Sequence, residues 1–358
     1  MACERRERYD AAEVRDRLGI ARAAEAVGVE WDMRKSRPAK RDFWACCPLH
    51  EEATPSFHVD DRRGFYKCFG CGARGDALGL VMAVENLDFR AALRRGAEIA
   101  GVAPDSATED ERRARAERQA AARAARVERM AREDARDAAR KASRALEMWR
   151  AAYRGPELAS YLAGRGVDLE LIGGVPASLR QAVLPFSEFH GQQLCMIAPV
   201  QQADGTVTGT HRTFLAAGGR GKLRAPGQGV KKMFGNCWGG AIRLGPVAPR
   251  IAIAEGIESA LGWLCLERAA GREAVVWAAG ARGNQCEAIE LPDEVRAVVL
   301  LADNDTDSRV ETEIAMDRGA ARLRRRGLGV EIRMPPRGMD FLDLWNAKGE
   351  GADAARHE

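Results

Sequence analysis

The sequence predicts a multidomain protein in which an α+β part is followed by an α/β part. Three observations carry this prediction. Four cysteines lie close together near the N-terminus, a stretch rich in alanine and arginine follows them, and short apolar runs then alternate with helix-length segments. Because 358 residues exceed the size of one typical domain, we expect a small cysteine-containing module, a helical linker and a larger domain with a parallel sheet.

Charge and hydropathy argue against a membrane-spanning protein and against a secreted one. No apolar run reaches the roughly 18 residues that a membrane span needs, and the N-terminus MACERRERYD is too charged for a secretory leader. The net charge of +4 is mild and by itself identifies no partner. We expect a cytoplasmic protein with no membrane association. In that reducing compartment, clustered cysteines bind metal more often than they form disulfides.

The cysteine window contains two pairs of candidate metal ligands. Cys47 and His50 are separated by two residues, Cys68 and Cys71 likewise, and 17 residues lie between the two pairs. Each pair can occupy a tight turn, and together the pairs complete a tetrahedron around a structural zinc ion.

Two other residues in this window compete as ligands. Cys46 leaves three residues before His50, a poorer fit than the two that Cys47 leaves. His58 lies in a strand-like segment without a partner at ligand spacing, so we expect a surface or binding role for it.

Helices are expected on both sides of the cysteine window, within a first domain of residues 1–102. Residues 11–29 have a helical pattern, and apolar side chains recur at helical spacing in residues 76–101. Asp76 stands where an N-cap is expected, and Gly101 stands where a glycine can close the helix.

Residues 103–148 are expected to form a helical linker. Residues 111–150 hold 13 Lys or Arg against 7 Asp or Glu, and alanine fills most of the rest. The alanine content and pairs such as Glu128 and Arg132 favour a solvated helix. Such a helix can be a semi-rigid spacer, or its basic face can also follow nucleic-acid phosphates, and the sequence leaves both interpretations open.

The remaining region predicts strands that alternate with helices. Residues 193–200 and 205–215 have the pattern of two strands joined by a tight turn. Further on, apolar runs such as RIAIAEG, EAVVWAAG and VVLLADND alternate with helices expected at 257–270 and 308–326. This alternation favours a parallel sheet that is covered on both faces.

Carboxylates follow the predicted parallel strands where those strands end. Glu255 follows one strand, Asp303 and Asp305 follow another, and Asp340 and Asp343 follow a third. Sites in open parallel sheets form outside the carboxyl ends of the strands, so we expect these side chains to converge. Clustered carboxylates need cations, and oxygen ligands select magnesium or manganese, which can assist nucleotidyl transfer. Each carboxylate taken alone also fits a helix cap.

The segment CPLHEEATPSFHVDDRRGFYKCFGCGARGD resembles the N-terminal zinc ribbon of bacterial and phage DNA primases. The ligand order Cys, His, Cys, Cys carries the resemblance, together with the TPSF and CFGCG stretches. It implies that the module binds the template strand, with Phe65, Tyr66 and Lys67 against single-stranded DNA, since aromatic faces beside positive charge suit unpaired bases. At least two aromatic residues of this segment are expected to form its core instead.

Residues 250–347 resemble the Toprim domain of bacterial-type primases, topoisomerases, some nucleases and a recombination mediator. The stretches IAIAEGIESAL, VVLLADND and MDFLDLW carry this resemblance, although the basic residue that precedes the last motif in phage-type members is missing. Glu255 is then a metal ligand or proton acceptor. The complete implied set of catalytic or metal-binding residues is Glu255, Asp303, Asp305, Asp340 and Asp343. Residues 348–358 are expected to form a flexible tail.

Residues 149–249 resemble the first part of a primase catalytic core. The stretches YLAGRGVDLELI and MIAPVQQADGTVTGTHRTFLAAGGRGKL carry this weaker resemblance. It implies a basic groove for the template and the incoming triphosphate, because phosphates need cations close by. The implied groove residues are Arg212, Lys222, Lys231 and Lys232.

Both resemblances on one chain predict a DNA primase that makes short RNA primers on single-stranded DNA. Its cofactors are structural zinc and catalytic magnesium or manganese, and its substrates are ribonucleoside triphosphates. One alternative is a non-catalytic single-strand-binding or recombination-mediator protein with a Toprim scaffold, and another is a Toprim nuclease. A topoisomerase is disfavoured because all four tyrosines precede the Toprim segment. No GxxxxGK[ST] phosphate loop occurs, so we expect a separate replicative helicase as partner, and the short form is typical of a phage or mobile element.

Overall fold

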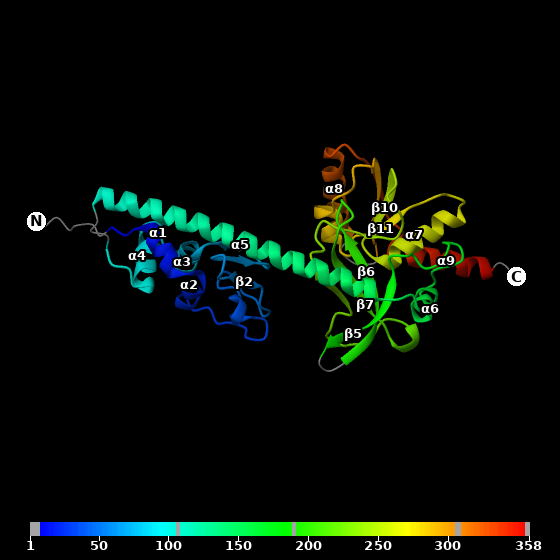
Figure 1. Ribbon diagram of the computed structural model, residues 1–358, viewed down its shortest axis with the longest axis horizontal. Helices are drawn as coiled ribbons and strands as arrows, with labels where there is room; N and C mark the ends of the chain where they lie inside the picture. The colour runs from blue at the N-terminus through cyan, green and yellow to red at the C-terminus, as the bar shows by residue number, and fades with distance from the viewer. Residues whose placement is uncertain (1–7, 105–107, 188–190, 305–308, 355–358) are drawn as a thin grey trace, which may run out of the picture. The chain divides into compact units, whose positions relative to one another are not determined.

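The computed structural model describes residues 8–104, 108–187, 191–304 and 309–354. Its contacts divide the chain into two compact units, Met1–Arg129 and Met130–Glu358. The helices and strands of both units are labelled in Figure 1. Within the described ranges, no helix has the length and apolar character that crossing a bilayer requires.

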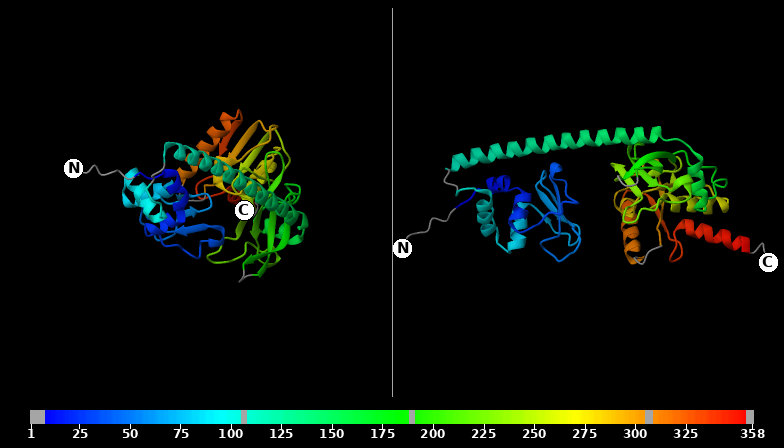
Figure 2. Two further views of the ribbon diagram at one scale, coloured as in Figure 1. Left: turned by 60° about the vertical axis from the view of Figure 1, so that its left-hand side comes forward. Right: turned by 90° about the horizontal axis from the view of Figure 1, so that it is seen from below.

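Unit 1 packs short helices beside a four-stranded antiparallel sheet (Figure 2). The strands follow in the order β1 (Asp42–Ala45), β2 (Phe57–Asp60), β3 (Phe65–Cys68) and β4 (Arg74–Gly75). The helices are α1 (Ala11–Leu18), α2 (Ile20–Ala26), α3 (Ala77–Glu85) and α4 (Phe89–Ala100), with a 3-10 turn, η1 (Pro38–Lys40), before β1. Their apolar faces meet in one core, in which Leu18, Phe57 and Leu78 are buried.

The segment 76–101 forms two helices where the sequence predicted one. Asp76 caps α3 and Gly101 ends α4 in the left-handed conformation, both as predicted. Between them, Asn86 ends α3 with a φ of 52°, and Asp88 caps α4. Asparagine tolerates the left-handed conformation and aspartate is a strong N-cap. These two local signals therefore interrupt an apolar pattern that is continuous in the sequence.

A single helix, α5 (Glu109–Ala151), occupies the expected linker region and runs without a break (Figure 1). Near its start, Arg115 forms an ion pair with Glu13 of unit 1 at 3.1 Å. In its last turns, the Trp149 indole donates a hydrogen bond to the Ser178 carbonyl of unit 2 at 2.9 Å. The helix is therefore not solvated along its whole length, because each end contacts one unit.

Unit 2 contains an antiparallel sheet in the order β5-β6-β7-β8. Its strands span Arg180–Ser187, Gly191–Gln201, Val207–Phe214 and Lys231–Gly235. Helix α6 (Pro156–Gly164) precedes this sheet, and a 3-10 turn, η2 (Ala217–Gly219), lies between β7 and β8. Strands β6 and β7 are the strand pair that the sequence predicted.

The second sheet of unit 2 has the order β13-β12-β10-β11-β9, with β9 antiparallel and the other four strands parallel. Its strands are β9 (Ile242–Arg243), β10 (Arg250–Ala254), β11 (Val276–Ala278), β12 (Ala297–Leu301) and β13 (Gly329–Arg333). The helices are α7 (Ile257–Ala269), α8 (Arg309–Arg325) and α9 (Phe341–Ala354), with a π-helical turn, η3 (Asn284–Ala288), after β11.

Helices cover both faces of this sheet (Figure 1). Ala252 and Ala254 of β10 belong to the core shared with α7 and α9, whereas Ile251 and Ile253 belong to the core shared with α8. The predicted parallel sheet with two covered faces is therefore confirmed. The sequence missed β9, because a strand of two residues carries no periodic signal.

Candidate functional site

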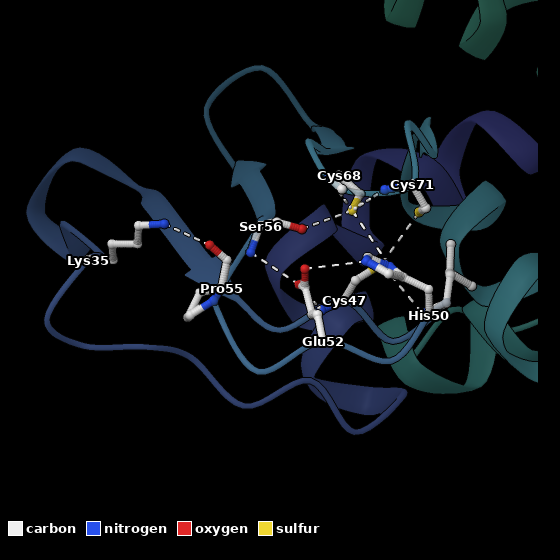
Figure 3. A network of polar contacts seen from close by, with 10 residues as sticks. Lys35, Cys47, His50, Glu52, Pro55, Ser56, Cys68 and Cys71 are labelled. Atoms are coloured by element: carbon white, nitrogen blue, oxygen red, sulfur yellow. Dashed lines mark hydrogen bonds and ion pairs between the residues drawn. The ribbon is translucent and has the colours of Figure 1, made fainter. Parts of the chain in front are cut away.

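The four predicted zinc ligands meet in unit 1 (Figure 3). Their ligand atoms all lie within 4.8 Å of one another. The Sγ atoms of Cys47 and Cys71 are 3.9 Å apart, and the Cys68 Sγ lies 3.9 Å from His50 Nδ1. Thiolates at the corners of a zinc tetrahedron with a Zn–S bond of about 2.3 Å stand about 3.8 Å apart. This donor set therefore fits a tetrahedral zinc ion.

The turn that carries Cys71 is shaped by backbone contacts to sulfur. The Sγ of Cys68 accepts hydrogen bonds from the N–H groups of Gly70 and Cys71, both at 3.3 Å. A Cβ on Gly70 would lie 2.7 Å from His50 Nε2, and Gly72 has a φ of +78° that favours glycine. A larger residue at Gly70 would displace His50, and one at Gly72 would strain the backbone of the turn.

Glu52 orients the histidine of the set. Its carboxylate accepts hydrogen bonds from the N–H of Cys47 at 2.7 Å and from that of Ser56 at 3.1 Å, and it lies 3.3 Å from His50 Nε2. With Nε2 facing Glu52, the Nδ1 atom faces the thiols, as in metal sites where a carboxylate fixes the tautomer of a ligating imidazole. Hydrogen bonds, that of Ser56 foremost, hold the pKa of Glu52 below its usual value. The sequence prediction missed this residue.

Two of the thiols differ in acidity. Burial raises the pKa of Cys47 to about 12. Burial acts in the same direction on Cys68, yet the Ser56 hydroxyl at 3.2 Å and the N–H groups of Cys71 and Gly70 lower its pKa to about 6. Cys68 therefore ionises readily, whereas Cys47 needs a nearby cation to become a thiolate, and a bound zinc ion supplies that charge.

Cys46 and His58 lie outside this ligand set. The Cys46 side chain is exposed to solvent. The Nε2 of His58 lies 2.8 Å from a carboxylate oxygen of Asp42, and its ring lies 4.7 Å from that of Trp44.

Tyr66 belongs to the core and not to the surface that was predicted to contact DNA. Along β3, Phe65 and Lys67 are exposed, whereas Tyr66 is 3% exposed and packs on Phe57 at 5.2 Å. Successive side chains of a strand point to opposite faces, so the three predicted contacts cannot share one surface. Tyr66 and Phe57 are instead core aromatics of the kind the sequence predicted.

The outer surface of the sheet carries an aromatic cluster, which we call the aromatic face. Trp44, His58 and Lys67 are direct neighbours across β1, β2 and β3. Phe69 is 59% exposed and stacks on Trp44 at 5.7 Å with an interplanar angle of 15°. The Lys35 ammonium lies 4.6 Å from the Trp44 ring, and that of Lys67 lies 4.8 Å from the Phe69 ring. Aromatic rings bordered by ammonium groups suit unpaired bases and their phosphates.

The predicted acids of unit 2 line one cavity of about 370 Å³. Glu255 follows β10, Asp303 follows β12, and Asp340 and Asp343 stand at the start of α9. Asp305 lies outside the described residues. The structure therefore brings four of the five predicted carboxylates to a shared cavity at the carboxyl ends of the strands.

These carboxylates do not converge as tightly as the zinc ligands. Among the described residues, the Cys–His set alone places three or more candidate ligand atoms within 4.8 Å. Asp303 accepts a hydrogen bond from the Ser259 hydroxyl at 2.8 Å. Asp340 accepts hydrogen bonds from the N–H groups of Leu342 and Asp343 at 2.7 and 2.8 Å, and Asp343 accepts one from the Asp340 N–H at 3.0 Å. Asp340 and Asp343 thus cap α9 and line the cavity as well. Their oxygen donors suit a hard cation such as magnesium.

Two of the four predicted groove cations line the cavity, and two do not. Lys222 and Lys231 are cavity residues. Arg212 and Lys232 are cross-strand partners on β7 and β8, and the Lys232 ammonium lies 3.9 Å from the Phe186 ring and donates to the Phe186 carbonyl at 2.7 Å. Because adjacent residues of a strand face opposite sides, Lys231 and Lys232 cannot both point into the cavity. Arg212 and Lys232 therefore do not line the acid cavity, and their place in a groove for the template and the triphosphate stays a prediction.

The sequence prediction missed Glu258, a carboxylate in the first turn of α7. It is 4% exposed and lines the same cavity. It accepts a hydrogen bond from the Tyr161 hydroxyl at 2.8 Å and lies 3.0 Å from the Lys222 ammonium. Burial opposes its ionisation, but the charges of Lys231 and Lys222 hold its pKa at about 2. The sequence feature that could have revealed Glu258 is its position as a carboxylate inside the apolar run IESALGWL.

The cavity wall combines both signs of charge. Arg165 and Arg282 line the cavity as well, and Arg282 donates a hydrogen bond to the buried Thr312 hydroxyl. The lining cations are Arg165, Lys222, Lys231 and Arg282. Cations beside carboxylates can hold a triphosphate together with the divalent ions that accompany it.

Three regions of the chain match known families. Residues 14–112 match the CHC2 zinc finger, and residues 250–351 match the Toprim domain. Residues 137–244 match a domain of unknown function (DUF7146). The chain therefore combines a CHC2 zinc ribbon with a Toprim domain.

Curated DNA primases match a short part of the chain. The DNA primase of Haemophilus influenzae is 47% identical over 68 residues, which are 19% of this chain and 12% of that protein. The DNA primase of Pseudomonas putida is 53% identical over 62 residues (17% and 9%), and that of Deinococcus radiodurans is 52% identical over 60 residues (17% and 10%). The matched part thus spans no more than 12% of the length of these relatives.

Solved primase structures show a distant likeness. The zinc-binding and RNA polymerase domains of the Aquifex aeolicus primase are 17% identical, covering 96% of this chain and 84% of that one, with a TM-score of 0.40. The primase fragment of the bacteriophage T7 primase-helicase protein is 12% identical, covering 85% and 94%, with a TM-score of 0.36. The domain assignment rests on the family matches.

Proposed function

We propose that this chain, which combines a CHC2 zinc ribbon with a Toprim domain, is a DNA primase that joins ribonucleotides into short primers on single-stranded DNA. One observation carries the proposal. A cavity at the carboxyl ends of parallel strands holds Glu255 and Asp303 beside Lys222 and Lys231, on the same chain as the zinc ribbon. A binder of polyanions gains nothing from several carboxylates in one cavity, whereas nucleotidyl transfer requires them.

The residues of the cavity have different roles in the proposed reaction. Glu255, Asp303 and Asp305, with Asp340 and Asp343, would hold magnesium or manganese. When bound there, such ions would supply the charge that activates an attacking 3′-hydroxyl and neutralises the departing pyrophosphate. Lys222 and Lys231 bind the phosphates of the incoming nucleotide as point charges. Ser259 keeps the Asp303 carboxylate oriented through its hydrogen bond at 2.8 Å.

The ribbon supplies the template contact in this proposal. Cys47, His50, Cys68 and Cys71 hold a structural zinc ion, which stabilises a module too small to fold well by its core alone. The aromatic face then stacks unpaired bases, while Lys35 and Lys67 contact the backbone. Phe65 is exposed on the same sheet and extends this surface. A separate replicative helicase as partner and a cytoplasmic location stay predictions from the sequence.

Primer synthesis on random single-stranded templates tests the proposal, with ribo- or deoxyribonucleotides and with magnesium or manganese in turn. Glu255→Gln and Asp303→Asn should each abolish synthesis and leave binding of single-stranded DNA intact, because that binding lies in the ribbon. Glu273→Gln is the matched control, since Glu273 is 89% exposed and lies outside the cavity. Primer synthesis that persists in both cavity variants would show that the acids are assigned wrongly.

A non-catalytic single-strand-binding protein is the second candidate. The spread of the described carboxylates favours it, because they do not converge as the zinc ligands do. Calorimetric titration of the zinc-loaded protein with magnesium or manganese separates the two candidates. A primase should bind these ions in the cavity, and a pure binder should not.

A further inference from the structure

Three elements of unit 2 meet at the Glu258 carboxylate. Tyr161 comes from α6, Lys222 follows the turn η2, and Glu258 lies in the first turn of α7. The Oε1 atom of Glu258 accepts the Tyr161 hydroxyl at 2.8 Å and lies 3.0 Å from the Lys222 ammonium. A Cβ on Gly219 would lie 2.0 Å from the Glu157 carbonyl of α6, so the loop that carries Lys222 is closely packed against that helix. Packing therefore fixes where the Lys222 backbone stands.

Lys222 shares its cavity with carboxylates that a divalent cation would need. Glu255, Asp303, Asp340 and Asp343 line the same wall. A flexible ammonium group among them would form an ion pair with one carboxylate and cancel charge that attracts a divalent ion. The Lys222 side chain is 32% exposed, so it has room to move unless another group holds it.

Glu258 is placed to hold that ammonium and is poorly placed to bind a metal itself. Its side chain is 6% exposed, and its Oε1 already faces two donors. The Lys231 charge also acts on it. A carboxylate surrounded by a hydroxyl donor and two ammonium groups neutralises cations of the protein and has little charge left for an added ion.

We propose that Glu258 is a positioning residue that anchors the Lys222 ammonium at the cavity wall, away from the metal-binding carboxylates. The pair keeps Lys222 available to phosphates and leaves the charge of Glu255 and Asp303 for divalent cations. This inference rests on the cation site of the proposed function.

The inference can be tested without an assay of activity by titrating the zinc-loaded full chain with Mn²⁺. The electron paramagnetic resonance signal of free Mn²⁺ then measures how much of the ion is bound. Glu258→Gln keeps the side-chain shape and removes the charge, so Mn²⁺ binding should weaken roughly tenfold. Adding Lys222→Met to that variant should return binding to within about threefold of wild type, because the released Lys222 ammonium is then absent and cannot pair with the metal-binding carboxylates. Glu267→Gln is the control on the same helix. Its carboxylate pairs with Arg272 at 2.6 Å and lies outside the cavity.

Several outcomes overturn the inference. Unchanged Mn²⁺ binding in Glu258→Gln would show that Glu258 has no such role. A double variant that binds as weakly as Glu258→Gln would make Glu258 a metal ligand. Lys222→Met alone should bind Mn²⁺ at least as tightly as wild type, and this variant decides the question if Glu258→Gln does not fold. Weaker binding in it overturns the inference. If wild type shows no Mn²⁺ binding that Glu255→Gln removes, the proposed cation site fails and the inference fails with it.

Discussion

We expect His211 to make unit 2 sensitive to mild acid. The imidazole lies on β7, is 5% exposed, and its Nδ1 has no hydrogen-bond partner among the described residues. Burial lowers its pKa from 6.5 to about 4. The negative charge of Glu258 opposes this shift, and three nearby cations add to it, namely Lys231, Lys222 and Arg212. The folded protein therefore strongly favours the neutral imidazole.

The direction and size of the effect follow from proton linkage. As the pH falls below 6.5, the imidazole of the unfolded chain takes up a proton, whereas the folded chain takes one up only near pH 4. The unfolded state binds more protons in this window, so the free energy of unfolding falls by about 1.4 kcal/mol per pH unit. Between pH 7.5 and pH 5, His211 alone should remove about 2 kcal/mol of stability.

Urea unfolding of wild type and His211→Leu at pH 7.5 and pH 5 measures this contribution. The stability of the variant relative to wild type should rise by about 2 kcal/mol between the two pH values. Effects of acid on the zinc site act on both proteins and cancel in the difference. Thr210→Val, a buried change on the same strand that removes no titratable group, is the control and should show no such relative change. If the curves of wild type and His211→Leu move in parallel with pH, the reasoning from burial is refuted.

The remaining predictions concern the zinc ligands, the groove and the aromatic face. Cys47→Ser should lose zinc while Cys46→Ser retains it, as measured by the metal content of the purified proteins; equal content would reject the ligand assignment. Lys231→Ala should raise the KM for nucleotides in primer synthesis. Lys232→Ala should leave that KM unchanged and cost about 1 kcal/mol of stability in urea unfolding, and the reverse pattern would contradict the two placements. Trp44→Ala should weaken binding of single-stranded DNA by about 1 to 2 kcal/mol in fluorescence anisotropy, and unchanged affinity would remove the aromatic face from the template contact.

The zinc ligands could be predicted from the sequence because their geometry is local. A spacing of two residues separates Cys47 from His50 and Cys68 from Cys71, and this spacing predicts a tight turn at each pair. The strands between the pairs bring those turns together. The acid cavity could be predicted because parallel strands end at one edge of a sheet. Glu258 could not, since its role depends on Tyr161 and Lys222, which precede it by 97 and 36 residues.

The predicted DNA contacts on β3 and the adjacent lysines on β8 are each divided between two faces, and both divisions have one physical origin, which is the alternation of side chains along a strand. For β3, the orientation of Tyr66 could have been predicted from the sequence. Cys68 is a ligand that must face the inside of the ribbon, so Tyr66, two residues earlier, faces inward as well, and Phe65 and Lys67 face out. For β8 no such marker exists, because neither of the adjacent lysines carries a signal for the side that faces the acids. Only the pairing of β8 with β7, which places Lys231 opposite Thr213 and Lys232 opposite Arg212, decides which lysine reaches the cavity. A motif therefore fixes which side chains face the binding surface only where one residue of the strand has a known orientation.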